Sequence, residues 1–307
     1  MSHKLMMKKN VRRSPLFYVG DKYKLISEIK THFPKDINKF VEPFVGGGSV
    51  FMNVDAKEFI LNDINTYVIS LHKFLSQQTD NTDEFFSNIW GIIKRYNLSC
   101  SYLCDDIPDD LKALYPKTYF AKYNKESYVK LRADYNNSGT PDMATLYLLL
   151  VYGFNHMLRF NSKGKFNLPV GNVDFNLNTV NALKSYFEEV RKKNPLWLNL
   201  DFRIFLSQLN LCKSDFIYLD PPYLITFSEY NKLWNENTER ELLSLLDNFS
   251  DSKIKFAISN VTHYKGRINN IFVEWAHKYN THPIKSNYIS YHDNSIKSFN
   301  EVLVTNY

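Results

Sequence analysis

The residues best suited to chemistry are Asp220, Pro221, Pro222 and Tyr223, which follow the apolar run at 216–219. A short run rich in β-branched and aromatic residues predicts a buried strand. Proline has no N–H to donate to a sheet, so the strand is expected to end at Asp220. A carboxylate, the Pro221 carbonyl and the Tyr223 ring would then form a pocket for a flat base with an exocyclic amine. A strand that merely ends in a turn is the alternative interpretation.

A second pattern places a carboxylate ahead of three glycines. Apolar residues from Phe40 lead into Glu42, and the glycines at 46–48 precede Ser49 and an expected helix. Glycine lets a ligand approach the backbone where a Cβ would block it. This is not the phosphate loop of nucleotide hydrolases, because no Gly-Lys-Ser/Thr follows. The carboxylate favours a cation, such as the amino group of an amino-acid-like cofactor, although a plain strand–turn–helix remains possible.

Further acidic residues follow two other predicted strands. Residues 59–61 lead into Asn62 and Asp63, and residues 196–200 lead into Asp201 and Phe202. In open α/β sheets, an acid about 20 residues beyond the first glycine turn commonly binds ribose hydroxyls. A helix cap is the alternative interpretation for this Asn-Asp segment.

The turn at residues 18–22 precedes an amphipathic segment, residues 23–33, that we expect to be helical. A glycine turn with a lysine at a helix start can hold a carboxylate or phosphate. Taken alone, this pattern favours a purely structural turn, because such turns are common.

The segment 155–171 predicts a β-hairpin around the turn at 161–165. Its cations are Arg159, Lys163 and Lys165, and asparagines stand at 155, 161 and 167. Arginine and asparagine read base edges, and lysine binds phosphate. A solvated hairpin is the alternative. The nearby His156 has no partner at metal-ligand spacing, so we expect it to be structural and predict no metal site.

Composition bounds the class of protein. The chain has 307 residues, 44% hydrophobic and 23% charged, with a net charge of +6. These values are typical of a globular protein of one or two domains, and the charge is compatible with an anionic partner. Three cysteines without framework spacing predict a reducing compartment. No apolar run reaches the ~18 residues that span a membrane, and the basic, polar residues 1–13 lack the apolar stretch of a signal peptide, so we expect a cytoplasmic protein.

Strands alternate with helices along most of the chain, which predicts an α/β fold with a doubly wound, mostly parallel sheet. The final strands are expected at 254–260 and 301–306, and residues 98–118 read as an irregular insertion. Thr238 and Glu241 fit a capping box at a helix start. Helices are expected at residues 85–96, 127–135, 143–154, 180–192, 203–209, 238–249 and 268–279.

In this order, the motifs resemble the DNA adenine N6-methyltransferase family, with the cofactor motif first, the recognition domain next and the catalytic motif last. The resemblance implies a Rossmann-like S-adenosylmethionine-dependent catalytic domain over residues 11–70 and 175–307. A mainly helical target recognition domain with the hairpin would be inserted over 71–174. The matching pieces are Tyr18-x-Gly20-x-Lys22, Glu42-Pro43-Phe44 with the glycines to Phe51, Asn62-Asp63-x-Asn65, Arg159-x-Asn161-x5-Asn167-x-Pro169-x-Gly171, Asp201-Phe202, Asp220-Pro221-Pro222-Tyr223, Ser259-Asn260 and residues 301–307.

The resemblance also implies site residues. Catalysis would fall to Asp220, Pro221, Pro222 and Tyr223. The residues implied in binding S-adenosyl-L-methionine are Tyr18, Gly20, Lys22, Glu42, Phe44, Gly46, Gly47, Gly48, Ser49, Phe51, Asp63, Asp201, Phe202 and Asp220. Those implied in binding DNA are Asn155, Met157, Arg159, Asn161, Lys163, Lys165, Asn167, Pro169 and Tyr230, while Phe227 would join Tyr230 in lining the pocket of the flipped base.

Two positions depart from the family pattern. Asp21 stands where the family often has glycine, which weakens the assignment of the lysine turn. Residues 98–118 are longer than in compact relatives, so the recognition sequence is expected to differ from their GATC.

The implied reaction is a direct methyl transfer to the amine of an adenine flipped out of duplex DNA, with no metal and no covalent intermediate. We expect a monomer that meets DNA in the nucleoid, with a cognate restriction endonuclease as a further candidate partner. Three alternatives stay open: the same chemistry on an RNA adenine or a protein glutamine amide, a DNA-binding cofactor sensor without turnover, and one half of a restriction system.

Overall fold

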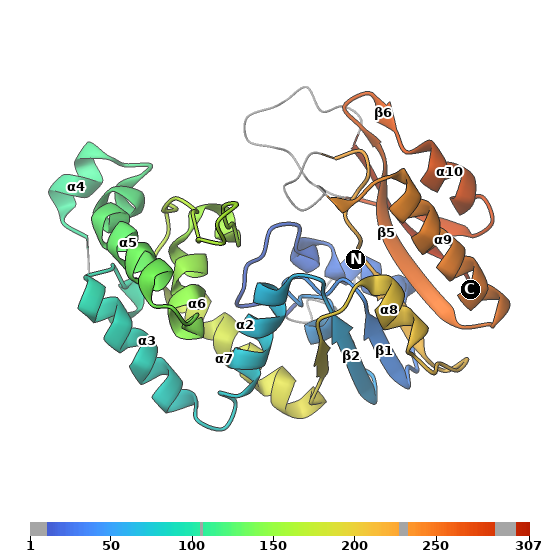
Figure 1. Cartoon of the computed structure of the whole chain (residues 1–307), viewed down its shortest axis with the longest axis horizontal. Helices are drawn as coiled ribbons and strands as arrows, with labels where there is room; N and C mark the ends of the chain where they lie inside the picture. The colour runs from blue at the N-terminus through green and yellow to red at the C-terminus, as the bar shows by residue number, and fades with distance from the viewer. Residues whose placement is uncertain (1–10, 105–106, 227–232, 286–298) are drawn as a thin grey trace, which may run out of the picture. The chain divides into compact units, whose positions relative to one another are not determined.

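The computed structural model describes residues 11–104, 107–226, 233–285 and 299–307 (Figure 1). The chain forms two compact units. The helical unit comprises Met1–Tyr23, Gly46–Met52 and Asn65–Lys192, and the sheet unit comprises Lys24–Val45, Asn53–Ile64 and Lys193–Tyr307. The helical unit contains the whole of the insertion expected over residues 71–174, whose boundaries remain a prediction.

The sheet unit is built on a mostly parallel sheet, as the sequence predicts. Within the described residues the strand order is β3-β2-β1-β4-β5-β8-β7, with β6 paired to β5. The strands from β3 to β5 are parallel, and β8 runs antiparallel between β5 and β7. Their bounds are β1 Lys39–Glu42, β2 Glu58–Asn62, β3 Leu196–Leu198, β4 Phe216–Leu219, β5 Lys255–Tyr264, β6 Arg267–Ile268, β7 Asn280–Ile284 and β8 Phe299–Thr305.

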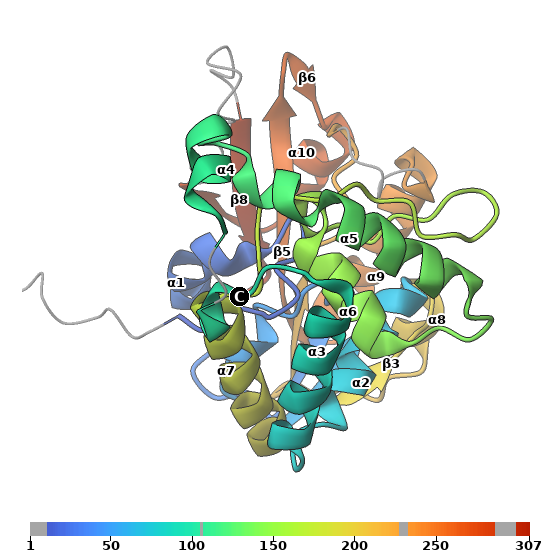
Figure 2. The ribbon, with the colours of Figure 1, turned by 90° about the vertical axis from the view of Figure 1, so that its left-hand side faces the viewer.

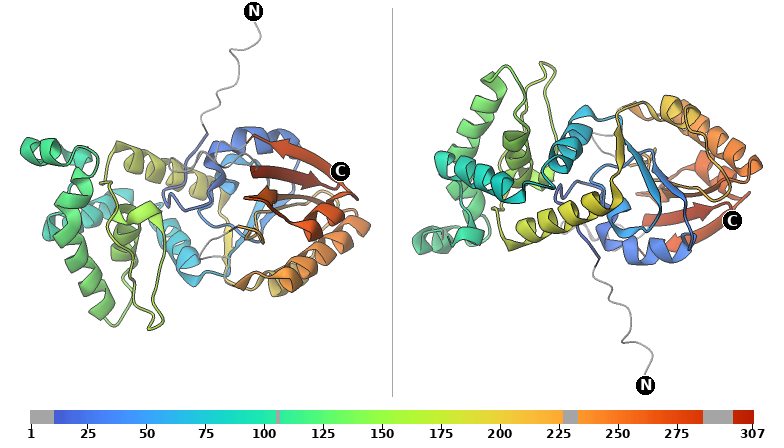
Figure 3. Two further views of the ribbon diagram at one scale, coloured as in Figure 1. Left: turned by 90° about the horizontal axis from the view of Figure 1, so that it is seen from above. Right: turned by 90° about the horizontal axis from the view of Figure 1, so that it is seen from below.

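Helices cover both faces of this sheet, which confirms the doubly wound class (Figure 3). α8 (Phe202–Ser207), α9 (Glu236–Asp251) and α10 (Asn270–Ala276) bury one face. On the other face, Phe33, which follows α1 (Ile26–Ile29), contacts the rings of Phe216 and Tyr218. All four residues of β4 are therefore buried, which explains its continuous apolar sequence.

The helical unit packs around one mostly apolar helix. α6 (Met143–Tyr152) has eight of its ten residues buried and contacts α2 (Thr66–Ser76), α3 (Thr82–Tyr96) and α5 (Tyr119–Asn137) (Figure 2). α4 (Asp109–Leu114) and α7 (Leu177–Lys193) are the other α-helices described in this part of the chain, beside the 3-10 turns Ser101–Leu103 and Phe154–His156. No helix among the described residues has the length and hydrophobicity needed to cross a bilayer.

Several local predictions were wrong. The capping box at Thr238 is not formed: Asn235 caps α9 by accepting a hydrogen bond from the Thr238 N–H, and Glu241 instead pairs with Arg203. Only a short 3-10 turn, Phe51–Asn53, follows Ser49 where a helix was expected.

The prediction of a single helix over residues 23–33 is also wrong. This segment is broken into α1 and two 3-10 turns, Lys22–Lys24 and Lys30–His32. It ends where Pro34 holds Phe33 extended. The α4 turn lies inside the segment 98–118 that was expected to be irregular.

Candidate active site

Acidic side chains follow the parallel strands of the sheet unit at their carboxyl ends. Glu42 ends β1 and is buried, with 2% of its surface exposed. Asp63 directly follows β2, and Asp220 directly follows β4, the strand that pairs with β1; both are half-buried. Because parallel strands end at one edge, the sheet brings these residues, far apart in sequence, to the edge at which α/β folds commonly bind ligands.

Asn62 ties together the loops that leave three of these strands. Its side-chain N–H groups donate to the carbonyls of Pro43 and Leu200, each at 3.0 Å, and its carbonyl accepts from the Leu200 N–H at 2.9 Å. The Asn62 backbone carbonyl also accepts from the Val45 N–H. This fully buried amide therefore sets where Glu42, Asp63 and Asp201 lie.

The 220–223 turn carries an internal hydrogen-bond network. The Tyr223 hydroxyl lies 2.9 Å from Asp220 Oδ1 and 3.2 Å from Glu301 Oε1, and Glu301 is a buried residue of β8. Burial, together with the carboxylates of Asp220 and Glu301, raises the pKa of Tyr223 well above its usual value. The hydroxyl is therefore protonated at any ordinary pH and acts as a donor.

Three aromatic rings meet beside these strand ends. Phe44, Phe202 and Trp234 have pairwise centroid distances of 5.5, 5.8 and 5.7 Å. The Trp234 indole N–H donates to Glu239, a buried carboxylate that also accepts from Asn260 and Asn269. Burial raises the pKa of Glu239 despite these donors. The rings offer an apolar surface of the kind that a nucleobase packs against.

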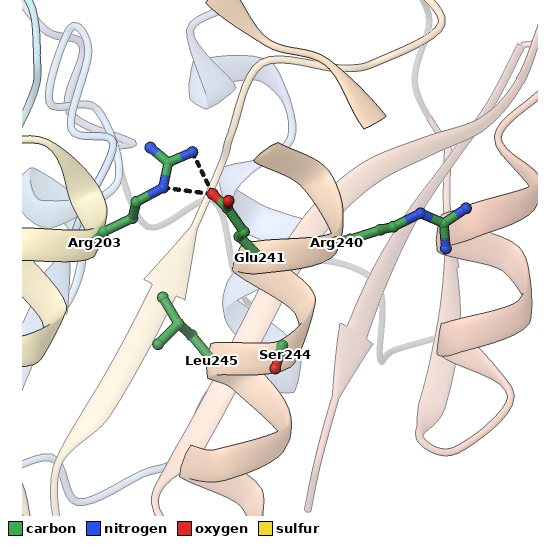
Figure 4. Close-up of a pocket in the computed structure, with 5 residues that line it drawn as sticks. All are labelled: Arg203, Arg240, Glu241, Ser244 and Leu245. Atoms are coloured by element: carbon green, nitrogen blue, oxygen red, sulfur yellow. Dashed lines mark hydrogen bonds and ion pairs between the residues drawn. The ribbon is translucent and has the colours of Figure 1, made fainter. Parts of the chain in front are cut away.

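Both side-chain oxygens of Asp201 form hydrogen bonds with Arg203. Its side chain caps α8 by accepting from the Arg203 N–H at 2.8 Å, and its second oxygen pairs with the Arg203 guanidinium at 2.9 Å. Arg203 also covers the Phe202 ring and reaches Glu241 of α9 (Figure 4). A surface cavity of about 420 Å³ beside this pair contains none of the predicted site residues; Arg203, Arg240, Glu241, Ser244 and Leu245 line it.

In the helical unit, the glycines have steric reasons to be glycine. Gly46 and Gly48 adopt φ of +46° and +81°. A Cβ on Gly47 would lie 2.9 Å from the Tyr18 Cβ, and one on Gly48 would lie 2.5 Å from the Phe51 ring. The Phe51 side chain is fully buried, so its ring packs the loop.

His72 of α2 fixes the glycine segment. Its Nε2–H donates to the Gly46 carbonyl and its Nδ1 accepts from the Tyr186 hydroxyl, each at 2.8 Å. Burial lowers the pKa of His72 to about 4, so the ring is neutral and this tautomer is set by the acceptor carbonyl.

The predicted lysine turn lies in the same unit as the glycines. Tyr18 packs against Gly46 and Gly47, Lys22 donates to the Gly20 carbonyl at 3.3 Å, and Gly20 adopts φ of +84°. Asp21, the departure from the family pattern, accepts from the Tyr23 N–H at 2.6 Å; burial raises its pKa, against a lowering effect of the nearby Ser49 side chain. The aspartate therefore stabilises the backbone of the turn at its own position.

The predicted hairpin forms through two isolated antiparallel bridges rather than continuous strands. Phe160 pairs with Phe166, and Gly153 pairs with Val170. The Phe160 ring stacks on the ring of Tyr67 in α2, with 3.8 Å between the ring centroids, and this contact anchors the hairpin.

The polar side chains of the hairpin divide into two groups. Arg159 donates to the side chain and the carbonyl of Asn167, and Asn161 accepts from the N–H groups of Lys163 and Lys165, so these asparagines stabilise the hairpin itself. Met157 is half-buried, whereas the exposed members of the predicted set are Asn155, Asn161, Lys163, Lys165 and Pro169. Phe227 and Tyr230 lie outside the described residues.

Sequence reasoning assigned no role to five residues that hold the candidate site in place: Asn62, His72, Trp234, Glu239 and Glu301. Their sequence neighbours are mixed rather than apolar, so no pattern marks them, although four of them are buried: Asn62, His72, Glu239 and Glu301. A buried polar residue needs partners, so such positions signal a hydrogen-bond network even where the sequence does not name the partner.

Comparison with known proteins gives consistent matches. The family model described as D12 class N6 adenine-specific DNA methyltransferase matches residues 18–290. Modification methylase StsI of Streptococcus sanguinis is 34% identical over 309 residues, and type II methyltransferase M.FokI of Planomicrobium okeanokoites is 35% identical over 305 residues. In each case the alignment covers 96% of this chain and 43% of the relative, so the chain spans less than half the length of these proteins. The DNA adenine methylase of Escherichia coli (strain K12) is 31% identical over 226 residues, 71% of this chain and 66% of the relative.

Proposed function

Because the chain belongs to the D12 class N6 adenine-specific DNA methyltransferases, we propose that it transfers the methyl group of S-adenosylmethionine to the N6 amine of an adenine in duplex DNA. The strongest support is the position of the 220–223 turn. It directly follows β4, and β4 pairs with the strand that ends in the buried Glu42.

In this proposal the 220–223 turn activates the acceptor amine. The lone pair of that amine is delocalised into the adenine ring, so it is a poor nucleophile. Asp220 and the Pro221 carbonyl each accept one of its N–H bonds, which moves the nitrogen towards a tetrahedral geometry. Tyr223 stacks on the ring and fixes its plane. Extracting the base from the duplex costs a few kcal/mol.

The donor groups of the sheet unit fit S-adenosylmethionine in chemical type. The buried carboxylate of Glu42 suits the amino group of the methionine part, Asp63 suits the ribose hydroxyls, and the rings of Phe44 and Phe202 suit the adenine. When bound, the cofactor supplies an electrophilic methyl on a positively charged sulfur. Because both oxygens of Asp201 already bond Arg203, we assign the adenine contact chiefly to Phe202.

DNA recognition is proposed for the hairpin. Lys163 and Lys165 are exposed at its turn and can neutralise phosphates. Arg159 can read a guanine edge if it exchanges its bonds to Asn167 for bonds to the base. A restriction endonuclease of matching specificity is the partner that we propose, since two relatives are named modification methylase and type II methyltransferase.

The proposed activity is tested by incubating the full chain with tritiated S-adenosylmethionine and genomic DNA. We expect label in duplex DNA, recovered as N6-methyladenine after digestion, and sequencing of modified adenines should return one short motif. RNA of matched length and denatured protein serve as the alternative acceptors. Label in RNA or protein alone would transfer the proposal to that substrate, and cofactor binding without any transfer would favour a sensor.

The hairpin assignment predicts a change in the salt dependence of DNA binding. Replacing Lys163 and Lys165 together by alanine removes two exposed cations. The slope of log affinity against log salt is expected to become shallower by about 2, because each phosphate contact contributes about 0.9. Fluorescence anisotropy on duplex DNA measures the slope. Lys192 and Lys213, also exposed, form the matched double control, and an equal change in both pairs would remove the hairpin from the interface.

A further inference from the structure

Glu301 occupies an unusual position for a carboxylate. It lies in β8, paired with Val261 of β5 and Ile284 of β7, and only 2% of its surface is exposed. The residues that follow it, Val302 to Val304, are apolar and buried. A carboxylate taken out of water is costly unless hydrogen bonds or charges compensate it. A buried carboxylate in β8 is therefore expected to have a hydrogen-bond partner that compensates for its loss of solvent.

The partner on its Oε1 atom is the Tyr223 hydroxyl, 3.2 Å away. The same hydroxyl lies 2.9 Å from Asp220 Oδ1, so one tyrosine links a carboxylate of β8 to the carboxylate at the end of β4. The Tyr223 carbonyl is held at the other end of the residue, because it accepts from both the N–H and the hydroxyl of Thr226. The ring is thus fixed from its backbone and from its hydroxyl.

We propose that Glu301 is a positioning residue for methyl transfer, acting through the Tyr223 hydroxyl on the ring plane of Tyr223 and on the orientation of Asp220. A carboxylate bonded through Oδ1 to a fixed hydroxyl has a defined rotamer, so its other oxygen points in a defined direction. Hydrogen-bond acceptors raise the rate only when they are held in the productive geometry. This inference rests on the proposed function, since it assigns Asp220 and Tyr223 to the acceptor base.

The same sheet offers an internal control. Tyr218 of β4 is fully buried, and its hydroxyl lies 2.9 Å from the Ser259 hydroxyl of β5. Replacing Tyr218 by phenylalanine removes a buried tyrosine hydroxyl from the same strand but leaves the bonds of Tyr223 to Asp220 and Glu301 untouched. It therefore measures the general cost of such a deletion.

The test is a double-mutant cycle between Tyr223→Phe and Glu301→Leu in the full chain. The readouts are the single-turnover rate of methyl transfer to duplex DNA at saturating cofactor and, separately, the cofactor dissociation constant. Each single change is expected to lower the rate by about 10- to 100-fold, and the double variant to be no slower than the slower single. Cofactor affinity should stay within about threefold, and Tyr218→Phe should keep the rate within about threefold.

Conservative variants separate the hydrogen bond from the charge. Glu301→Gln retains an acceptor oxygen and is expected to recover the rate to within about threefold, whereas Glu301→Asp withdraws the acceptor and is expected to lose about tenfold. If Glu301→Leu does not fold, Glu301→Asp takes its place in the cycle. The proposal is overturned by losses that multiply in the double variant, by a Gln variant as slow as the Leu variant, or by full activity of either single variant. A wild-type chain that methylates no DNA would instead refute the proposed function.

Discussion

Replacing Asp220 by alanine is expected to lower the rate of methyl transfer by about 10²- to 10³-fold, the loss typical of removing one preorganised hydrogen-bond partner of a transition state. Cofactor affinity should fall only slightly, because Glu42, Asp63 and the aromatic rings remain. The Tyr223 hydroxyl keeps Glu301 as an acceptor at 3.2 Å, so the change leaves no buried donor unsatisfied. The measurement is transfer of tritiated methyl groups to duplex DNA, with cofactor binding followed by calorimetry.

Two matched variants serve as controls for the effect of Asp220→Ala. Asp220→Asn keeps one acceptor oxygen and the shape of the side chain, so it should retain more activity than the alanine variant. Asp251→Ala removes an exposed carboxylate at the end of α9 and should leave the rate unchanged. Near-normal turnover of Asp220→Ala would show that the catalytic assignment of the 220–223 turn is wrong.

Much of the fold could be predicted because local chemistry decides it. Proline must end β4 after Leu219, and buried parallel strands must read as apolar runs. The strand β7 was not predicted, because its sequence has no apolar run. It contains Pro283 and mostly exposed residues, and it lies at the edge of the sheet, where proline is tolerated. The cap of α9 was misassigned because a tertiary partner, Arg203, takes the glutamate that a capping box would use.

Only part of the candidate site could be predicted from the sequence. Residues at strand ends, such as Asp63 and Asp220, could be predicted because a sheet collects its carboxyl ends whatever the rest of the chain does. The residues that orient them could not. Asn62 bonds Leu200 across 138 positions, His72 bonds Tyr186 across 114, and Tyr223 meets Glu301 across 78. No local pattern encodes a partner at that separation, so these contacts depend on the three-dimensional packing.

Replacing Gly48 by alanine is expected to lower the free energy of unfolding by about 3 kcal/mol, from overpacking and a strained backbone together. The new Cβ would lie 2.5 Å from Phe51 Cε1 and 3.0 Å from His72 Cε1, and φ is +81°. Both neighbours are fully buried, so neither ring can move aside cheaply. Displacing His72 also loosens its bond to the Gly46 carbonyl, so cofactor affinity should fall by about 10-fold or more. Urea unfolding and calorimetry measure the two effects.

Gly139→Ala separates overlap from backbone strain, because Gly139 adopts φ of +72° but has open space where a Cβ would stand. That variant should lose only about 1 kcal/mol and keep full cofactor affinity, since it carries the strain of a left-handed residue alone. Equal losses in the two variants would mean that close packing is not what requires glycine at position 48. A partial recovery of stability in Gly48→Ala with Phe51→Leu, which shortens the obstructing side chain, would locate the overlap at Phe51. Because cofactor contact is predicted for the glycines, the double variant should recover stability further than it recovers affinity.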